Sequence, residues 1–248
     1  MKHAYNCVKT GIMVLAMHSA NEGERSVAEN CAGYLKRRGR KNVHVAYHSG
    51  KPRSDDVMEN MFTSEGIDTF CILPLAIAEG NMTTWLMPRR LGLPDSSGSW
   101  RMMGKHDIAT RFGTALGTSE VMADAILRNI GEPERGTGII FLARGSKMSQ
   151  SEKVAEYYSS KIKSAGWHSR AAFARFGPNN VPGVISVLKS EGCSNLMLVP
   201  LFISTTGASY ARAMADLENA EIDFIETKPV SEYPEFMEIM DSKVPKSW

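Results

Sequence analysis

The chain contains one set of segments twice, and this repeat constrains its fold more than any other feature. "GIMVLAMHSANEGE" begins at Gly11, and a variant, "GIIFLARGSKMSQSE", begins at Gly138, 127 residues later. "VAYHSGKP" ends at Pro52 and "AAFARFGP" ends at Pro178, a spacing of 126 residues. "FCILPLAIAEGNM" and "LMLVPLFISTTGA" are 126 residues apart as well. Three segments that recur in the same order at nearly constant spacing indicate an internal duplication.

Each copy alternates short apolar runs with amphipathic stretches. The runs at 11–16, 43–48 and 69–77 are too short for helices and predict strands, as do 138–143, 169–176 and 195–203. The stretches between them, at 23–39, 54–66, 149–166 and 179–192, have the apolar spacing and end signals of helices. Such alternation predicts an α/β protein with two duplicated, doubly wound, parallel-sheet half-domains, residues 1–133 and 134–248. The segment 92–107, rich in Ser and Gly, predicts a loop in the first half.

Composition sets limits on where the chain works and what it binds. The hydrophobic content is 43%, the charged content 23% and the formal charge +2, which is ordinary for a globular protein and shows no basic run typical of nucleic-acid binding. The four cysteines form no C-x-x-C pair, so we interpret them as reduced thiols. The apolar run "GIMVLAM" is too short to span a bilayer. We expect a soluble, cytoplasmic protein with neither nucleic acid nor membrane as partner.

Polar turns follow the predicted strands in both halves. In doubly wound sheets, ligands bind beyond the carboxyl ends of the strands. The turn Met17-His18-Ser19 and the segment "AEGNMTTW" follow strands of the first half. Arg144-Gly145-Ser146 and "STTGASY" follow strands of the second half. The sequence therefore predicts a cleft shared by both halves and lined by these four segments.

Several of these segments carry a family resemblance. "GIMVLAMHSA" and "GIIFLARGSK" resemble the G-I-L-L-x-x-H-G-S-R motif of the class II tetrapyrrole chelatases. "LPLAIAEGNMTTWLMPRRLG" and "VPLFISTTGASYARAM" resemble that family's V-P-L-F-L-x-x-G-x-H motif, and "AAFARFGPNNVP" is similar to its V-A-F-L-E-x-x-x-P segment. The resemblance covers nearly the whole chain and implies the fused, two-half form, as a monomer or homodimer. It implies insertion of Co, Fe or Ni into a sirohydrochlorin-type macrocycle, with the divalent metal as a substrate.

The histidines of these motifs are replaced in this chain. In the family they hold the metal and accept pyrrole protons; the aligned residues here are Met17, Met82, Arg144 and Ala208. His18 lies one position from the first of them, and the resemblance makes it the candidate base and metal ligand. Glu79 is the candidate acid of the first-half cleft. The alternative for His18 is a side chain turned away from the cleft.

The remaining candidates are substrate contacts. Met17 and Met82 would form an apolar lining under a flat ligand or touch, through their thioethers, a metal already held in a macrocycle. Arg144 and Arg175 would bind carboxylate arms, or else form a salt bridge between the halves. The other predicted contacts are polar or aromatic side chains near strand ends: Ser19, Thr83, Trp85, Ser146 and Ser209. Ser19 and Ser146 could instead cap the helices that follow them.

Two functions are compatible with these residues. The first is a chelatase that inserts a divalent metal into a sirohydrochlorin-type tetrapyrrole. The second is a tetrapyrrole- or haem-binding protein, or an enzyme of altered chemistry, that kept the cleft and lost metal insertion; its ligand would be a metallated tetrapyrrole. A duplicated scaffold for a smaller anionic ligand is a third possibility.

Overall fold

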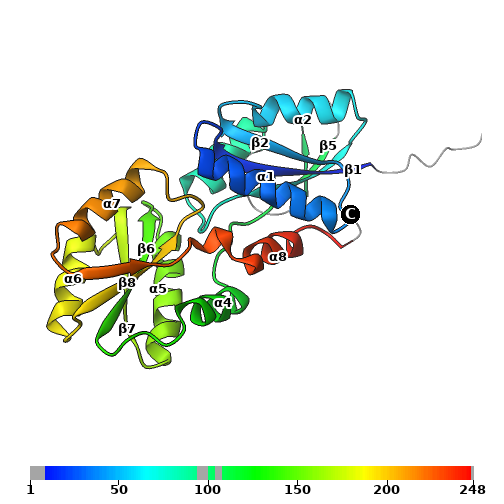
Figure 1. Cartoon of the computed structure of the whole chain (residues 1–248). Helices are drawn as coiled ribbons and strands as arrows, with labels where there is room; N and C mark the ends of the chain where they lie inside the picture. The colour runs from blue at the N-terminus through cyan, green and yellow to red at the C-terminus, as the bar shows by residue number, and fades with distance from the viewer. Residues whose placement is uncertain (1–8, 94–99, 104–107, 247–248) are drawn as a thin grey trace, which may run out of the picture.

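The computed structural model describes residues 9–93, 100–103 and 108–246 and consists of two α/β half-domains (Figure 1). The elements of the first half are β1 (Thr10–His18), α1 (Glu22–Arg37), β2 (Val43–Ser49), α2 (Ser54–Thr63), β3 (Thr69–Pro74), the π-helix η1 (Met82–Leu86), α3 (Met87–Arg90), β4 (Trp100–Met103) and β5 (Ile108–Phe112). Helix α4 (Glu120–Ile130) follows. The remaining elements are β6 (Thr137–Gly145), α5 (Gln150–Ser164), β7 (His168–Phe176), α6 (Val181–Ser190), β8 (Asn195–Leu201), α7 (Ala208–Glu218), β9 (Asp223–Glu226), the 3-10 helix η3 (Val230–Glu232) and α8 (Pro234–Ser242).

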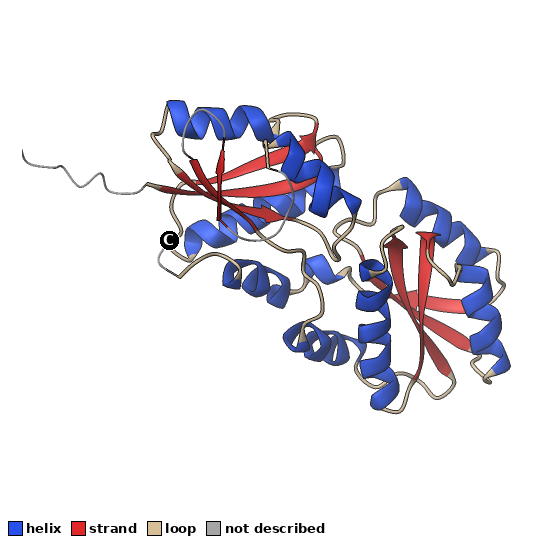
Figure 2. Ribbon diagram, turned by 180° about the vertical axis from the view of Figure 1, so that it is seen from behind, coloured by secondary structure: helices blue, strands red, loops and turns tan. Residues whose placement is uncertain are grey.

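The two sheets have equivalent central strands. The first sheet has the order β2-β1-β3-β5-β4 and the second the order β7-β6-β8-β9, and helices cover both faces of each (Figure 2). All pairs are parallel except β4–β5, which is antiparallel and closes the edge of the first sheet. The predicted fold class is confirmed.

The loop predicted at 92–107 needs one correction. Residues 100–103 form β4, because a chain that returns directly beside β5 can pair with it as an antiparallel neighbour. Residues 94–99 and 104–107 lie outside the described part of the chain.

Strand β1 shows why the first sheet is covered on both faces. Ile12 and Val14 belong to a buried cluster with Leu35 of α1, whereas Met13 and Leu15 belong to another cluster, which includes residues of α2 and α3. Successive residues of a strand point to opposite faces, so an uninterrupted apolar run requires a cover on each side.

The two halves exchange their last helices. Helix α4 follows the first sheet but packs against α5, and Tyr158 of α5 donates a hydrogen bond to the carbonyl of Gly117, 2.8 Å away. Helix α8 ends the second half but packs against α1 and α4, so the end of the chain lies beside the first half (Figure 1). Phe236 and Met240 of α8 are fully buried in the cluster that contains residues of both halves. The boundary between residues 133 and 134 therefore stays a prediction, because helices near it pack across the halves.

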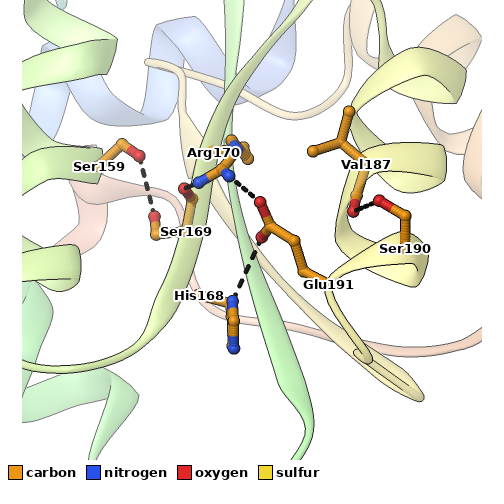
Figure 3. A network of polar contacts seen from close by, with 7 residues as sticks. All are labelled: Ser159, His168, Ser169, Arg170, Val187, Ser190 and Glu191. Carbon is orange, nitrogen blue, oxygen red and sulfur yellow. Dashed lines mark hydrogen bonds and ion pairs between the residues drawn. The ribbon is translucent and has the colours of Figure 1, made fainter.

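A contact between a basic side chain and a glutamate is repeated at the duplication spacing of 126 residues. His44 Nε2 of β2 lies 3.1 Å from Glu65 Oε2, and at the equivalent positions Arg170 of β7 pairs with Glu191 after α6. Figure 3 shows the second pair with His168, whose Nδ1 lies 3.2 Å from the other carboxylate oxygen. These contacts lie near the amino-terminal end of β7, away from its carboxyl end. They connect the second strand of each half, β2 or β7, to the residues just after the following helix, α2 or α6.

No helix in the described ranges has both the length and the apolar character needed to cross a bilayer.

The docking of α8 depends on a largely buried charge pair. Arg40 Nε lies 2.8 Å from Asp241 Oδ1, and their side chains are 13% and 15% exposed. We expect Asp241→Ala to lower the free energy of unfolding by about 3 kcal/mol, because Arg40 loses its carboxylate partner in a site with little water. Urea denaturation measures the change.

Glu235→Ala, on the same helix, is the matched control. Glu235 pairs with Arg128, which is 61% exposed, so its loss should change stability by less than about 1 kcal/mol. Equal effects of the two substitutions would contradict the assigned role of Asp241.

Candidate functional site

The carboxyl ends of the strands of both halves open into one cleft of about 910 Å³. Its lining comes from the turns after β1 and β6, the end of β7, and the segments after β3 and β8. This volume is in the range of sites that hold a small molecule or cofactor. The predicted shared cleft is therefore present.

A smaller cavity of about 420 Å³ lies between α1 and the segments 203–206 and 231–237. The titratable side chains in its described lining are Glu232 and Tyr233.

Equivalent contacts join the halves around the cleft. Asn21, the N-cap of α1, accepts hydrogen bonds from Ser204 Oγ at 3.1 Å and Thr206 Oγ1 at 2.8 Å. In the reciprocal position, Thr84 Oγ1 lies 3.7 Å from Met148 Sδ. In each case the turn after the first strand of one half touches the segment after the third strand of the other half. The duplication thus gives the cleft an approximate two-fold arrangement.

Methionines form an apolar part of the first-half wall. Met17 ends the buried stretch of β1, and Met82 begins the π-helix η1; both line the cleft. Both are partly buried and pack against the same hydrophobic cluster. Single π-helical turns often occur at functional sites. Two flexible thioether side chains on one cluster give the cleft an adaptable apolar surface.

His18 is exposed and lines the cleft beside Met17. Its backbone N–H donates to Oε2 of Glu24 at 2.8 Å. His18, the predicted base, therefore lies at the cleft although it is one residue away from the position of the family histidine. Its catalytic and metal-binding roles stay predictions.

Both oxygens of Glu79 are engaged. Oε2 accepts from Thr83 Oγ1 at 2.5 Å, and Oε1 accepts from the N–H of Ala115 at 2.6 Å. Thr83 is 3% exposed, so this network holds the segment after β3 in place. Lys243 is also near: burial lowers its pKa, and the charge of Glu79 acts in the opposite direction. Glu79 and Thr83 line the cleft as expected, and the hydrogen bond between them stabilises this segment. The predicted catalytic role of Glu79 and the predicted substrate-binding role of Thr83 stay predictions.

Glu24 lines the cleft and was missed by the sequence analysis. Burial raises the pKa of its carboxyl group, while hydrogen bonds from the backbone of His18 and Met17 and the charges of His18 and Arg144 lower it. In the sequence it is an acid in the first turn of a helix, next to Glu22, and such acids are common because they complement the helix dipole. Glu24 lies seven residues after Met17 and belongs to no recognisable motif, so its place at the cleft becomes apparent only in the folded structure.

Cations and hydroxyls form the second-half wall. Arg144 and Arg175 line the cleft together with Lys147, Ser146 and Ser209. Within the described ranges neither arginine forms an ion pair. The charge of Arg144 acts on Glu24 of the first half, so both the carboxylate-arm role and the inter-half salt bridge stay predictions. Ser146 Oγ accepts from the N–H of Met148 at 3.1 Å.

Neither serine proposed as a cap is the N-cap of the helix that follows it. Asn21 caps α1, and the N-cap of α5 is Ser149, which makes no side-chain capping bond. That interpretation of Ser19 and Ser146 was wrong, because the N-cap of each helix lies two or three residues after the serine.

Two predicted contacts lie outside the cleft lining. Ser19 Oγ accepts from the N–H of Lys51 at 3.0 Å, which ties it to the loop before α2. Trp85 is 43% exposed, and the guanidinium of Arg89 lies 3.6 Å from its ring centroid. Contact of either residue with a substrate stays a prediction.

Metal ligands are sparse around this cleft. Across the described residues, no group of three or more His, Cys, Asp or Glu side chains could hold a metal ion. Cys31, Cys71 and Cys193 are free and buried, and burial raises the pKa of Cys31 and Cys71 to about 12. These thiols are therefore poor metal ligands at neutral pH.

Comparison with known proteins decides the family. The family model described as CbiX matches residues 12–132 and 138–247. The chain belongs to the CbiX family. The model matches each half in turn, which confirms the duplicated, class II chelatase-like form. None of the curated proteins with which the sequence was compared matches it.

Solved structures share the fold of this CbiX-family chain. The sirohydrochlorin chelatase SirB from Bacillus subtilis subspecies spizizenii, in complex with cobalt, has a TM-score of 0.73 at 12% identity, over 95% of this chain and 94% of that chain. CbiX, described as the terminal enzyme for biosynthesis of siroheme in denitrifying bacteria, has a TM-score of 0.63 at 18% identity, over 94% and 97%.

A multi-domain protein from Deinococcus radiodurans with structural similarity to chelatases has a TM-score of 0.73 at 19% identity. The match covers 98% of this chain and 56% of that protein, so the chain spans little more than half of its length.

Gly145 shapes the turn that presents Arg144. Its φ is +81°, and a Cβ at this position would lie 1.5 Å from the carbonyl oxygen of Phe176. We expect Gly145→Ala to lower the free energy of unfolding by about 3 kcal/mol or more, because both the φ angle and the clash with backbone are unfavourable. Urea denaturation gives the value.

Gly166→Ala separates the two causes. Gly166 has a φ of +95°, with no atom within 4 Å of an added Cβ. Its substitution should cost about 1 kcal/mol, the strain of the backbone alone. If both variants lose the same stability, the close approach of Phe176 has no effect on the turn.

Proposed function

We propose that this chain binds a sirohydrochlorin-type tetrapyrrole in the cleft between its halves and inserts a divalent metal, Co, Fe or Ni, into it. The observation that carries the proposal is the pairing, within one cleft, of a methionine-lined wall with a wall that presents Arg144 and Arg175. A flat macrocycle with carboxylate arms matches both walls. Membership of the CbiX family and the shared fold with SirB support the same function.

The second-half wall would hold the arms. A guanidinium binds a carboxylate through two parallel hydrogen bonds, and both arginines are exposed at strand ends where such arms could reach them. Ser146 and Ser209 would add hydroxyl contacts. Met17 and Met82 would lie against the ring, as the sequence resemblance implies.

Metal insertion also requires a proton acceptor. Two ring N–H groups lose their protons as the metal binds to the ring nitrogens. A thioether is a weak acceptor and takes no proton at neutral pH, so neither Met17 nor Met82 can replace the family histidines. An imidazole accepts protons near neutral pH, so His18 is suited to this step.

The second candidate function is tetrapyrrole or haem binding without metal insertion. The observation that favours it is the loss of every aligned family histidine, at Met17, Met82, Arg144 and Ala208. A metal already held in a macrocycle would need no base, and a thioether suits an axial position on haem iron. We further propose a cytoplasmic location, with which the free, buried cysteines agree, and a monomer or homodimer.

Anaerobic absorbance spectroscopy tests the function. Sirohydrochlorin is titrated into the protein, and Co²⁺, Ni²⁺ or Fe²⁺ is then added. We expect metallation faster than in the protein-free control, and a roughly hundredfold slower rate for His18→Ala, because a positioned base contributes about that much. A spectral shift without faster metallation would favour the second candidate, and no shift at all would contradict both.

The binding role of Arg144 has its own test. Arg144→Gln should raise the Kd for sirohydrochlorin roughly tenfold or more, because a charge-assisted hydrogen-bond pair is lost. Arg135→Gln, an exposed change of the same kind outside the cleft lining, is the control and should leave the Kd unchanged. Fluorescence or absorbance titration at fixed salt measures both; equal Kd values for wild type and Arg144→Gln would exclude this contact.

A further inference from the structure

Charge is segregated across the cleft. Among its described lining residues, the cations Arg144, Lys147 and Arg175 all belong to the second half, whereas the carboxylates Glu24 and Glu79 belong to the first half. His18, which is also part of this described lining, belongs to the first half as well. An anionic arm and a divalent cation would therefore be attracted to opposite walls.

The two carboxylates are not equivalent. Glu79 is held through both oxygens by Thr83 and by the N–H of Ala115. Glu24 accepts at Oε2 from the backbone N–H of His18, 2.8 Å away, and its carboxylate interacts electrostatically with the His18 side chain. Glu24 is thus the carboxylate of the described lining that contacts the residue bearing the imidazole, and the charge of Arg144 also acts on it. A cation bound there could gain both an oxygen donor and a nitrogen donor.

We propose that Glu24 is the carboxylate that receives the divalent metal in the cleft, with the imidazole of His18 as the second donor, before the metal passes to the ring nitrogens. The inference rests on the proposed function and adds to it the wall from which the metal approaches. Carboxylate oxygen and imidazole nitrogen are both common ligands of Co²⁺, Fe²⁺ and Ni²⁺.

A site with only two protein donors suits a metal that is then transferred to the ring nitrogens. No third His, Cys, Asp or Glu side chain completes a site within the described residues, so water would fill the remaining positions. The metal exchanges its bonds to Glu24 and His18 for bonds to the ring nitrogens. The imidazole of His18, once it has released the metal, accepts the protons that the two ring N–H groups lose and passes them on to water. The step therefore needs neither an oxidant nor a reductant.

The alternative role of Glu24 is to hold the turn through the His18 N–H. Glu24→Gln separates the roles, because the amide oxygen still accepts that hydrogen bond while the charge is lost. Glu22→Gln is the matched control. Glu22 is an acid of the same first helical turn, but it is exposed and lies outside the cleft lining.

Metallation kinetics with varied Co²⁺ give the first readout. For Glu24→Gln we expect the KM for Co²⁺ to rise roughly tenfold or more, with the Kd for sirohydrochlorin within twofold of wild type. Glu22→Gln should match wild type in both. An unchanged KM for Co²⁺, or a weaker sirohydrochlorin Kd that accounts for the whole loss of rate, would overturn the proposal.

A second readout does not depend on catalysis. Mn²⁺ alone, added to the uniformly labelled protein, should broaden the amide NMR signals of residues 17–24 in wild type and Glu22→Gln, but not in Glu24→Gln. If wild type fails to metallate sirohydrochlorin but shows this pattern, the metal site stands and the proposed function fails. If wild type metallates and Glu24→Gln changes neither readout, the function stands and the metal site fails.

Discussion

The cleft depends on the exchange of helices between the halves. Two separate α/β units would each have strand ends open to solvent, and nothing in either sheet would make those ends face one another. Here α4 packs on the second half and α8 packs back on the first, with Phe236 and Met240 buried in one core common to both. The Arg40–Asp241 pair fixes the returning helix against the loop that follows α1. The strand ends face one another because the core is continuous across the halves.

Duplication supplies two similar backbones, and substitution makes their walls different. The carboxyl end of β1 carries Met17 and His18, whereas the carboxyl end of β6 carries Arg144 and Gly145. One wall is apolar with two carboxylates and an imidazole, and the other is cationic. A symmetric cleft would accept a ligand in two orientations related by the two-fold axis. The charge difference would favour one of them, since an anionic arm would gain hydrogen bonds at the cationic wall and would meet carboxylates at the other.

Much of the fold could be predicted from the sequence because it depends on apolar runs and their repetition. Strands such as 11–16 and 138–143 are uniformly apolar, and their positions follow from length and turn residues alone. Strand β4 could not be predicted in this way, since a four-residue edge strand depends on its partner β5 rather than on its own composition. The cleft lining was predictable at the carboxyl ends of strands, as with His18 and Arg144, and in the segment after β3, as with Met82. It was not predictable for Glu24, whose position depends on the way α1 leaves the turn, nor for Ser19 and Trp85, which occupy the right segments but lie outside the lining.

The helix exchange also limits how the halves can move. The chain passes between them in two places, once after β5 near Gly117 and again between β9 and α8. Two connections define a line, and a relative rotation of the halves would take place about that line. Such a rotation would separate the contacts that Asn21 makes with Ser204 and Thr206. Each of these hydrogen bonds, one part-buried and one exposed, contributes only about 1 kcal/mol, so they restrain such a rotation far less than the common core does.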